Sequence, residues 1–426
     1  MAKYVIVGAS AAGLGAVEAI RKIDQTGTIT VITDEACSHY SRPMISDFVS
    51  GNADMKKINC RTEEFWKEQN VEAVTSKKAT VLNFTEKTVQ LESGEKIAYE
   101  KLLIATGGKP FVPKTEGSEK DGVFTFTTIG DAQRIAAKID AINAKAAVVI
   151  GGGLIGISVT EALLKRGLKV TMVELQDKIL SLLLDAKGSD IMEAVVRKAG
   201  VDIVTGQSVQ KIFGKPDNDG AVGGVLLTKG GQVSCDLVIM AIGVIPRTEL
   251  VMGSAVKINR GIVVDNFMQT NVPDVYASGD VAEAYDFIIN QNRTLPLWPL
   301  AVMEGQVAGY NMAGKKTTYG GGTNMSSLKY FGVPIVSIGL ANPKEDPTLE
   351  VLVKQDIENI VYKKLVLKND IIVGLTFVNC IESAGVMFYL MKNAINVKKI
   401  KQQLLSDDFS WATLPIGLQR KMSVVQ

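Results

Sequence analysis

Apolar runs that end in glycine open two stretches of the chain with the same order of elements. Residues 4–8 (YVIVG) and 147–151 (AVVIG) each predict a buried strand, followed by a glycine-rich turn and a helical pattern that continues to Lys22 or Arg166. A second predicted strand ends at Asp34 in the first stretch (TITVIT) and at Glu174 in the second (KVTMV). Strand, helix and strand in this order predict βαβ units with parallel sheets, so the fold class is α/β.

The two turns repeat one pattern, GASAAG at 8–13 and GGGLIG at 151–156. With an offset of 143 residues, four positions coincide: Gly8, Ser10, Gly13 and Glu18 on Gly151, Gly153, Gly156 and Glu161. The first position permits the tight turn, the second lets the backbone approach a pyrophosphate, and the third permits close packing of helix on strand. The helix N-terminus stabilises the phosphate charge, and the acids that end the second strands are placed to accept hydrogen bonds from a ribose.

Two such devices in one chain predict two bound dinucleotides. A nicotinamide and a flavin are the natural pair, because hydride passes from one to the other. Two ordinary strand–helix turns without a ligand are the alternative. The full order of strand, motif, helix and strand-end acid, found twice, favours nucleotide binding.

Three further segments connect these units. LLIATGG at 102–108 and LVIMAIG at 237–243 each predict a buried strand that leaves through glycine, and the second continues as VIPR. VPDVYASGDVAE predicts a short strand, a glycine turn and the start of a helix, with Asp280 at that start. The Asp280 carboxylate is placed to accept hydrogen bonds from a polyol chain, and a plain helix N-cap is the alternative.

The C-terminal region predicts strands at PIVSIG, IVYKKLVLK and IIVGLTFV, then a helix around Ala384 to Asn393. Four lysines lie in or after that helix: Lys392, Lys398, Lys399 and Lys401. We interpret them as a solvated face, with a docking patch for an acidic electron carrier as the alternative. The tail from Phe409 to Leu418 is apolar without a clear period, and we expect it to dock on a partner or, alternatively, to pack on its own chain.

Composition narrows the class of protein. A hydrophobic share of 46% with 22% charged residues is typical of globular proteins, and a net charge of +2 does not indicate nucleic acid. The four cysteines (Cys37, Cys60, Cys235 and Cys380) form no CxxC, so their spacing indicates neither a zinc site nor a dithiol motif and fits a reducing compartment. No apolar run reaches the roughly 18 residues of a membrane span, and we expect a cytoplasmic protein.

The set GASAAG, LLIATGG, GGGLIG, LVIMAIG and YASGD resembles the FAD-dependent pyridine nucleotide-disulfide oxidoreductase superfamily over about residues 1 to 400. HYSRPMISDFVSG most resembles its single-component reductase branch, with rubredoxin and ferredoxin reductases, the nitrite reductase flavin domain and FAD subunits of multi-subunit oxidoreductases. The resemblance implies two Rossmann-like dinucleotide-binding domains, one inserted in the other, plus a C-terminal α+β domain. The expected segments are 1–110 (first FAD-binding segment), 111–242 (NAD-binding domain), 243–319 (second FAD-binding segment) and 320–426 (C-terminal interface domain with tail).

The resemblance also implies the cofactor contacts. Arg42 and Pro43 would lie along the FAD, Asp280 would hold its ribityl chain, and Trp298 would cover the ring edge, with plain core as the alternative for this Trp. The other expected FAD residues are Gly8, Ser10, Ala12, Gly13, Asp34, Glu35, Ala79, Ala105, Thr106, Gly107, Gly243 and Gly279. The expected NAD residues are Gly151, Gly153, Ile155, Gly156 and Glu174. Ser158, Asp47 and Thr127 stand where many relatives have Glu, Lys and Arg, so detailed hydride geometry does not carry over.

The stretch EACSHYSR at 35–42 holds Cys37 and the only histidine, His39, and suggests an activated cysteine. Disulfide reductases of the superfamily use paired cysteines in the helix after the first glycine motif and a C-terminal histidine. This chain has neither. We therefore interpret Cys37 and His39 as loop residues packed over the FAD, because adjacency in sequence is poor evidence of catalytic geometry.

The leading hypothesis is an NADH-linked FAD oxidoreductase that exchanges electrons with a one-electron iron–sulfur protein or partner subunit. A thiol/disulfide or peroxide reductase that uses Cys37 is an alternative, and a flavin-binding scaffold subunit of a larger complex is another. Glu174 predicts NADH over NADPH, because a carboxylate bonds a free ribose 2′-hydroxyl and repels a 2′-phosphate.

Overall fold

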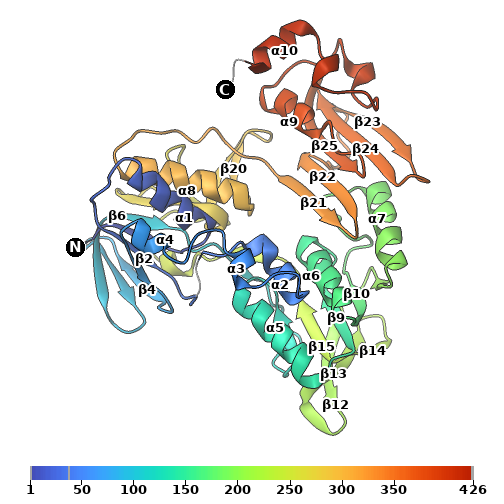
Figure 1. Ribbon diagram of the computed structural model, residues 1–426, viewed down its shortest axis with the longest axis horizontal. Helices are drawn as coiled ribbons and strands as arrows, with labels where there is room; N and C mark the ends of the chain where they lie inside the picture. The colour runs from blue at the N-terminus through green and yellow to red at the C-terminus, as the bar shows by residue number, and fades with distance from the viewer. Residues whose placement is uncertain (1, 37–38, 424–426) are drawn as a thin grey trace. The chain divides into compact units, whose positions relative to one another are not determined.

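The chain forms two compact units, each assembled from three segments. The computed structural model describes residues 2–36 and 39–423. The first unit contains Met1–Pro113, Thr125–Asn143 and Gly243–Gly322, and the second contains Lys114–Phe124, Ala144–Ile242 and Thr323–Gln426 (Figure 1). The second unit therefore joins most of the predicted NAD segment to the C-terminal region. The four expected domain segments remain a prediction.

A parallel sheet organises the first unit. Its strands follow the order β3 (Val71–Val74), β2 (Ile29–Ile32), β1 (Ala2–Val7), β6 (Lys96–Ile104) and β18 (Val275–Ala277). Ile104 of β6 lies opposite both Val7 of β1 and Ala277 of β18. The carboxyl ends of these three strands therefore meet, which places the residues after them at one edge of the sheet. An antiparallel hairpin of β4 (Ala79–Asn83) and β5 (Thr88–Leu91) extends β6.

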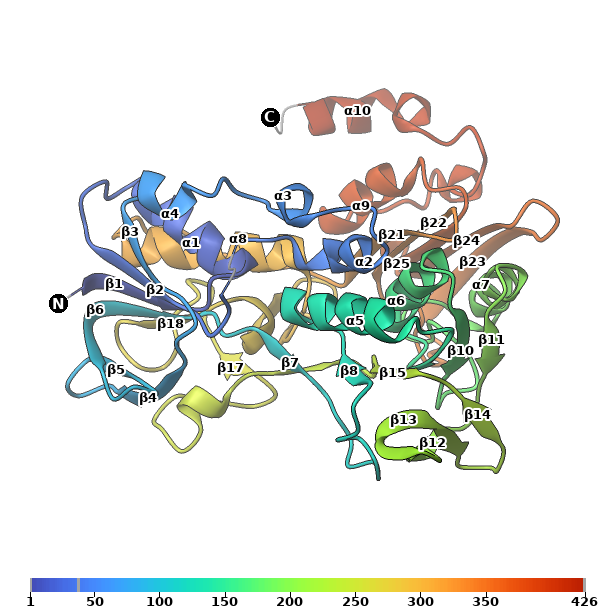
Figure 2. The same ribbon diagram turned by 60° about the horizontal axis from the view of Figure 1, so that its bottom comes forward.

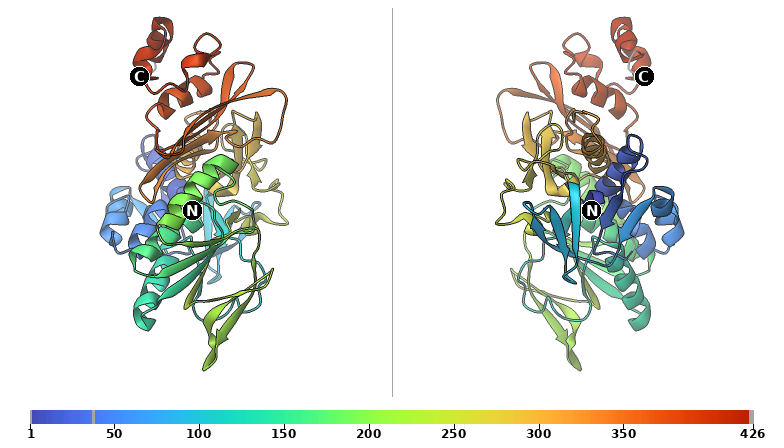
Figure 3. Two further views of the ribbon diagram at one scale, coloured as in Figure 1. Left: turned by 90° about the vertical axis from the view of Figure 1, so that its right-hand side faces the viewer. Right: turned by 90° about the vertical axis from the view of Figure 1, so that its left-hand side faces the viewer.

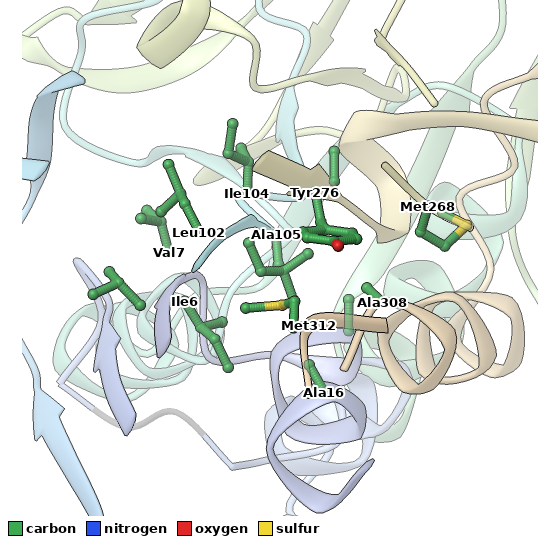
Figure 4. Packing of buried hydrophobic residues seen from close by; sticks show 14 of the residues in the cluster. Ile6, Val7, Ala16, Leu102, Ile104, Ala105, Met268, Tyr276, Ala308 and Met312 are labelled. Atoms are coloured by element: carbon green, nitrogen blue, oxygen red, sulfur yellow. The ribbon is translucent and has the colours of Figure 1, made fainter. Parts of the chain in front are cut away.

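Helices α1 (Ala11–Arg21) and α8 (Trp298–Met312) pack closely because glycines face backbone across their interface (Figures 1 and 2). A Cβ atom on Gly305 would lie 2.0 Å from the carbonyl oxygen of Ala12, and one on Gly15 would lie 2.6 Å from that of Val302. Figure 4 shows Ala16 and Ala308 between these helices, beside the buried side chains of the sheet. Larger residues at these glycines would separate α1 from α8.

The remaining elements of the first unit are short, apart from one helix. They are η1 (Arg42–Met44), α2 (Ile45–Val49), α3 (Met55–Ile58), α4 (Phe65–Glu68), β7 (Gly108–Pro110), α5 (Ile129–Ile142), β16 (Val244–Pro246), η2 (Glu249–Val251), β17 (Ile262–Val263), η3 (Gly279–Val281), β19 (Ala282–Asp286) and β20 (Gln291–Arg293). The expected helix start at Asp280 is wrong, because Asp280 lies in the single 3-10 turn η3 and strand β19 follows at once. The alternative interpretation of Asp280 as a helix N-cap is therefore also wrong.

The second unit begins with another parallel arrangement. Its strands are β11 (Asp202–Val204), β10 (Lys169–Val173), β9 (Ala146–Ile150), β15 (Leu237–Met240) and β8 (Val123–Thr125), in this order. Helix α6 (Leu154–Lys165) follows β9, and α7 (Ala186–Lys198) follows β10. A separate three-stranded sheet contains β12 (Val209–Lys215), β13 (Asn218–Leu227) and β14 (Gln232–Ser234).

The C-terminal part of this unit is an antiparallel sheet with helices. The strand order is β21 (Met325–Tyr330), β22 (Val333–Gly339), β25 (Ile371–Val378), β24 (Val361–Lys368) and β23 (Leu349–Asp356), and α9 (Ala384–Lys392), η4 (Lys401–Gln403), η5 (Trp411–Thr413) and α10 (Ile416–Ser423) follow. Ile335 and Tyr362 of this sheet share one buried cluster with Met172 of β10 and Met192 of α7. The left view of Figure 3 shows the green α7 beside these orange strands. The C-terminal sheet is thus packed into the second unit.

Part of the apolar tail is buried against the rest of the chain. Phe409 and Leu414 are 4% and 3% exposed, while Trp411 and Ile416 are 37% and 67% exposed. The expectation that the segment docks on a partner instead of completing its own fold is therefore wrong for Phe409 and Leu414. Among residues 2–36 and 39–423, no helix is both long and apolar enough to cross a membrane.

Candidate functional site

The first glycine-rich turn is built around the end of β1. Gly8 has φ +117°, and a Cβ atom there would lie 2.0 Å from the carbonyl oxygen of Ala105. A Cβ atom on Gly13 would lie 2.0 Å from the carbonyl oxygen of Gly8. Because no side chain fits at either position, the turn stays tight and α1 begins directly at the sheet edge.

The N-terminus of α1 is open to an anion. Ser10 is its N-cap residue, but the Ser10 side chain makes no capping hydrogen bond. The Ser10 hydroxyl instead accepts a hydrogen bond from Nε of Arg42 at 3.3 Å. The first-turn N–H groups, including that of Ala12, therefore have no side-chain cap. The Arg42 guanidinium lies beside them, so this end of α1 offers both the N–H donors and the positive charge that a pyrophosphate needs.

Arg42 is held by three different segments of the first unit. Nη1 donates to the carbonyl of Thr127 at 2.7 Å, and Nη2 forms an ion pair with Glu35. Tyr40 donates its hydroxyl hydrogen to Glu35 at 2.6 Å and accepts from the backbone N–H of Ile129 at 3.1 Å. The guanidinium is thus fixed from the β2 loop, from the α1 turn and from the segment before α5.

Asp34 and Glu35 have different partners. Asp34 lies after the end of β2 and pairs with Arg247, whose Nη1 is 3.0 Å from its Oδ2 atom. The Arg247 carbonyl accepts from the Thr106 hydroxyl at 2.8 Å. Asp34 is more exposed than Glu35, so it keeps the better access to a ribose, whereas the Glu35 carboxylate is already bonded to Arg42 and Tyr40.

The Gly279–Asp280 turn lies at the same edge, after β18. Burial raises the pKa of Asp280, and the positive charge of Arg42 opposes this effect. The Gly279 N–H donates to Oε2 of Glu304 at 2.8 Å, and Glu304 is 2% exposed. Burial raises the pKa of Glu304 to about 8. The buried Ser278 hydroxyl has no hydrogen-bond partner among the described residues.

The structure places the other expected FAD residues as follows. Ala105 and Gly107 follow β6 beside Gly8, and a Cβ atom on Gly107 or Gly243 would meet no heavy atom within 4 Å. Pro43 is the second residue of η1, directly after Arg42. Ala79 begins β4, and Trp298 begins α8 and packs partly buried against the first unit's core. The strand-end residues gather at one edge, while Ala79 pairs with Leu91 in the hairpin of β4 and β5.

The second glycine-rich turn has the same construction. Gly151 has φ +110°, and a Cβ atom on Gly156 would lie 1.8 Å from the Gly151 carbonyl oxygen. Gly153 is the N-cap residue of α6, lacks a side-chain cap, and would place a Cβ atom in open space. Ile155 is the second residue of α6. The open space at Gly153 and the uncapped helix match a site for a second pyrophosphate.

Glu174 directly follows β10, as its role requires. Its Oε2 atom accepts from the N–H of Gly152, and its Oε1 atom accepts from the N–H of Gln176 at 2.7 Å. The nearest expected cation, Lys178, forms an ion pair with Asp190. The Glu174 carboxylate is therefore fixed at the glycine-rich turn, and Lys178 is already paired and is not available to balance a 2′-phosphate.

Of the two residues in the hypothesis of an activated cysteine, the structure describes only His39. Cys37 lies outside the described residues. His39 lies next to the short pairing of Tyr40 with Asn59, and its carbonyl accepts from the Cys60 thiol at 3.0 Å. Burial lowers the pKa of the His39 imidazole, whose Nδ1 atom has no partner in the described part of the chain. This environment disfavours a charged imidazole.

Both sites fit the nucleotides that they are expected to hold. Glycine cradles, uncapped helix N-termini, the Arg42 guanidinium and the orphaned Ser278 hydroxyl suit FAD, and the Gly151 cradle with Glu174 suits NAD. Sequence reasoning missed Tyr40, Arg247 and Glu304. The signal for Glu304 was available, since it is the only charged residue in the helical stretch WPLAVMEGQVAGYNM.

Comparisons with known proteins identify the family and the relatives of this chain. The family model described as pyridine nucleotide-disulphide oxidoreductase matches residues 2–305, and the model described as rubredoxin NAD+ reductase C-terminal domain matches residues 325–394. The chain is 31% identical over 408 residues to the NADH-dependent phenylglyoxylate dehydrogenase subunit epsilon of Aromatoleum evansii, covering 95% of each chain. It is 29% identical over 337 residues to the NADH-rubredoxin oxidoreductase of Clostridium acetobutylicum, covering 79% of this chain and 81% of the relative.

A solved structure shows the same fold over the whole length. The covalent putidaredoxin reductase–putidaredoxin complex matches with a TM-score of 0.87 at 23% identity, covering 100% of this chain and 99% of the other. At this level of identity the match concerns the fold alone.

Proposed function

The chain belongs to the pyridine nucleotide-disulphide oxidoreductase family, and we propose that it passes electrons between NAD(H) and a one-electron iron–sulfur protein or partner subunit through FAD. The family resemblance, the α/β fold class and the use of FAD and NAD(H) by an oxidoreductase, all expected from the sequence, are confirmed. The acceptor and the residue roles belong to the proposal.

The observation that carries the proposal is the pair of matched phosphate cradles in one chain. Gly8 and Gly151 have nearly equal φ angles, and each accepts the close approach of a glycine five residues later. The helix after the first cradle, α1, contains no cysteine, so the paired thiols of the family's disulfide reductases are missing there. A chain with two dinucleotides and no dithiol at this position favours a one-electron acceptor over a disulfide.

We assign the roles residue by residue. Gly8, Gly13 and the α1 N-terminus would hold the FAD pyrophosphate with Arg42, Asp34 would accept from the adenosine ribose, and Asp280 would hold the ribityl chain. Gly151, Gly153, Gly156 and Glu174 would hold NAD. When bound, FAD supplies the exchange of a hydride for electrons. The residues of the protein would bind and orient the two cofactors, and the positive charge of Arg42 would offset the negative charge of the FAD pyrophosphate.

The partner class rests on the relatives. The C-terminal region matches the rubredoxin NAD+ reductase C-terminal domain, and one relative is described as an NADH-rubredoxin oxidoreductase. The relative whose alignment covers 95% of each chain is described as a subunit of an NADH-dependent dehydrogenase, so a sister subunit is an equal candidate for the partner. A cytoplasmic location completes the proposal, since four scattered cysteines without a CxxC fit a reducing compartment.

Anaerobic titration of the FAD-loaded protein with NADH tests the proposal. The visible flavin absorbance should bleach, and a one-electron dye or an iron–sulfur protein should then restore it. A chain that binds FAD but never bleaches would instead be a scaffold subunit. In the alternative function as a thiol/disulfide or peroxide reductase, Cys37 carries the reaction, and Cys37→Ser should abolish turnover with a disulfide or peroxide. In the proposed function, the same variant should keep its turnover with one-electron dyes.

A further inference from the structure

A short loop connects the NAD-binding turn to the C-terminal sheet. We call residues 180–185 (LSLLLD), between β10 and α7, the strap. At its start, the N–H of Leu180 donates to the carbonyl of Gly152 at 2.8 Å. The N–H of the same Gly152 donates to Glu174. The strap is therefore hydrogen-bonded to Gly152, and Gly152 is in turn hydrogen-bonded to the Glu174 carboxylate, which is the proposed ribose-binding group.

The other end of the strap is held by side chains of the C-terminal sheet. Tyr362 and Lys364 of β24 donate to Oδ2 of Asp185 at 2.6 and 2.8 Å. Ser337 of β22 donates its hydroxyl hydrogen to the carbonyl of Leu183 at 3.0 Å. Because Asp185 also accepts from Gly188 at 3.0 Å and so caps α7, one carboxylate joins the strap, α7 and the C-terminal sheet.

The strap conformation is imposed by its surroundings. Leu180 has φ +53°, a left-handed conformation that is rare for a large side chain. Leu180, Leu183 and Leu184 are nevertheless buried, in the cluster that contains residues of α7 and of the C-terminal sheet. Lys364 is also buried, so its pairing with Asp185 is shielded from water. Such a conformation persists where neighbouring structure over-determines it.

We propose that the C-terminal sheet is a positioning element of the NAD site, acting from Lys364 and Tyr362 through Asp185 and the strap on Gly152 and Glu174. This rests on the proposed assignment of the NAD site to Gly151–Gly156 and Glu174. Lys364 and Asp185 are positioning residues, since they touch the strap and not the nucleotide. The C-terminal domain then does more than offer a surface for partners: it sets the nicotinamide nucleotide's affinity.

The test compares the NAD+ affinity of the wild type with that of two variants, Lys364→Met and Ser337→Ala, measured by calorimetry on the oxidised, FAD-loaded protein. Lys364→Met and Ser337→Ala remove strap contacts with little change in volume. We expect the dissociation constant for NAD+ to rise about tenfold in Lys364→Met, which corresponds to about 1.4 kcal/mol, and by less in Ser337→Ala. FAD content should stay unchanged, and in steady state KM for NADH should rise more than kcat falls.

Two controls separate positioning from general stability. Lys401→Met removes ion pairs with Glu350 and Asp370 in the same C-terminal domain, away from the strap, and should leave NAD+ affinity at the wild-type value. Lys364→Arg keeps a donor for Asp185 and should restore most of the affinity. Amide hydrogen exchange at Leu180 should quicken in Lys364→Met and, by less, in Ser337→Ala, and should stay unchanged in Lys401→Met.

The inference is overturned if Lys364→Met and Ser337→Ala bind NAD+ as tightly as wild type, or if Lys401→Met weakens binding equally. Where Lys364→Met does not fold, the milder Ser337→Ala carries the same comparison. A wild-type protein that fails to bind NAD+ at all would instead refute the proposed function, so the two failures differ.

Discussion

The backbone N–H of Gly279 donates a hydrogen bond to the carboxyl group of Glu304, which is 2% exposed in the interface of α8 with the Gly279–Asp280 turn. The hydroxyl of Tyr319 is 3.4 Å from the other oxygen of Glu304. Burial raises the pKa of Glu304 from 4.5 to about 8, and the nearby charge of Asp280 adds to the effect. Glu304 therefore keeps its proton at neutral pH, which avoids an unpaired charge beside the predicted flavin site.

The first prediction is that Glu304→Gln stabilises the protein above pH 5. In the unfolded chain Glu304 loses its proton near pH 4.5, while in the folded chain it keeps it to about pH 8. Wild-type stability therefore falls as pH rises through this window, by at most about 1.4 kcal/mol per pH unit. Glutamine does not titrate, so the difference in melting temperature between variant and wild type should grow from pH 5 to pH 8 and then level off.

The control for this prediction is Glu345→Gln, which changes an exposed carboxylate of the second unit. Its melting temperature should follow that of the wild type at every pH. A Glu304→Gln variant that gains the same stability at pH 5 as at pH 8 would show that Glu304 is not protonated when folded.

The second prediction concerns retention of FAD. Arg42→Met removes the guanidinium at the α1 N-terminus and leaves Glu35 without its cation. A charge-assisted hydrogen bond contributes about 1.5–3 kcal/mol, so we expect FAD affinity to fall by roughly ten- to a hundredfold. The flavin fluorescence released on dilution measures this loss. Lys67→Met, which removes an exposed ion pair with Glu64 in the same unit, should keep its FAD.

Local sequence patterns were enough to predict the glycine turns and the strands that lead into them. Glycine is required at Gly8 and Gly13 because a Cβ atom there would lie 2.0 Å from a carbonyl oxygen, and this requirement is visible in the sequence of the turn itself. Pairings between distant segments are not visible in this way. Arg247 and Asp34 are 213 positions apart, and only the fold brings them together. The prediction for the C-terminal tail was wrong for the same reason, since the burial of Phe409 depends on a surface that is formed by other parts of the chain.

The third prediction concerns the choice of nicotinamide nucleotide. Glu174 is fixed by the N–H of Gly152, and Lys178 is paired with Asp190, so no described cation next to Glu174 balances a 2′-phosphate. We expect kcat/KM for NADH to exceed that for NADPH by about tenfold or more, a difference of about 1.4 kcal/mol. Glu174→Ala should narrow this ratio, chiefly by lowering kcat/KM for NADH. Glu193→Ala, which removes an ion pair on α7 with Arg197, should leave the ratio unchanged. Equal specificity constants in the wild type would contradict the prediction.

The last prediction divides the C-terminal tail at Pro415. Removal of residues 416–426 takes away α10, whose first residue, Ile416, is 67% exposed, so stability, FAD content and NADH–dye activity should persist. Removal of residues 406–426 also takes away Phe409 and Leu414, and burial of each contributes roughly 1.5–3 kcal/mol. It further strips Asp407 from Lys363, a lysine that is 2% exposed and whose ammonium then lies buried without this partner. We expect the longer deletion to lower the melting temperature sharply or to give insoluble protein. A fully stable longer deletion would show that the tail only rests on the sheet, and loss of acceptor activity in the shorter one alone would place partner docking in α10.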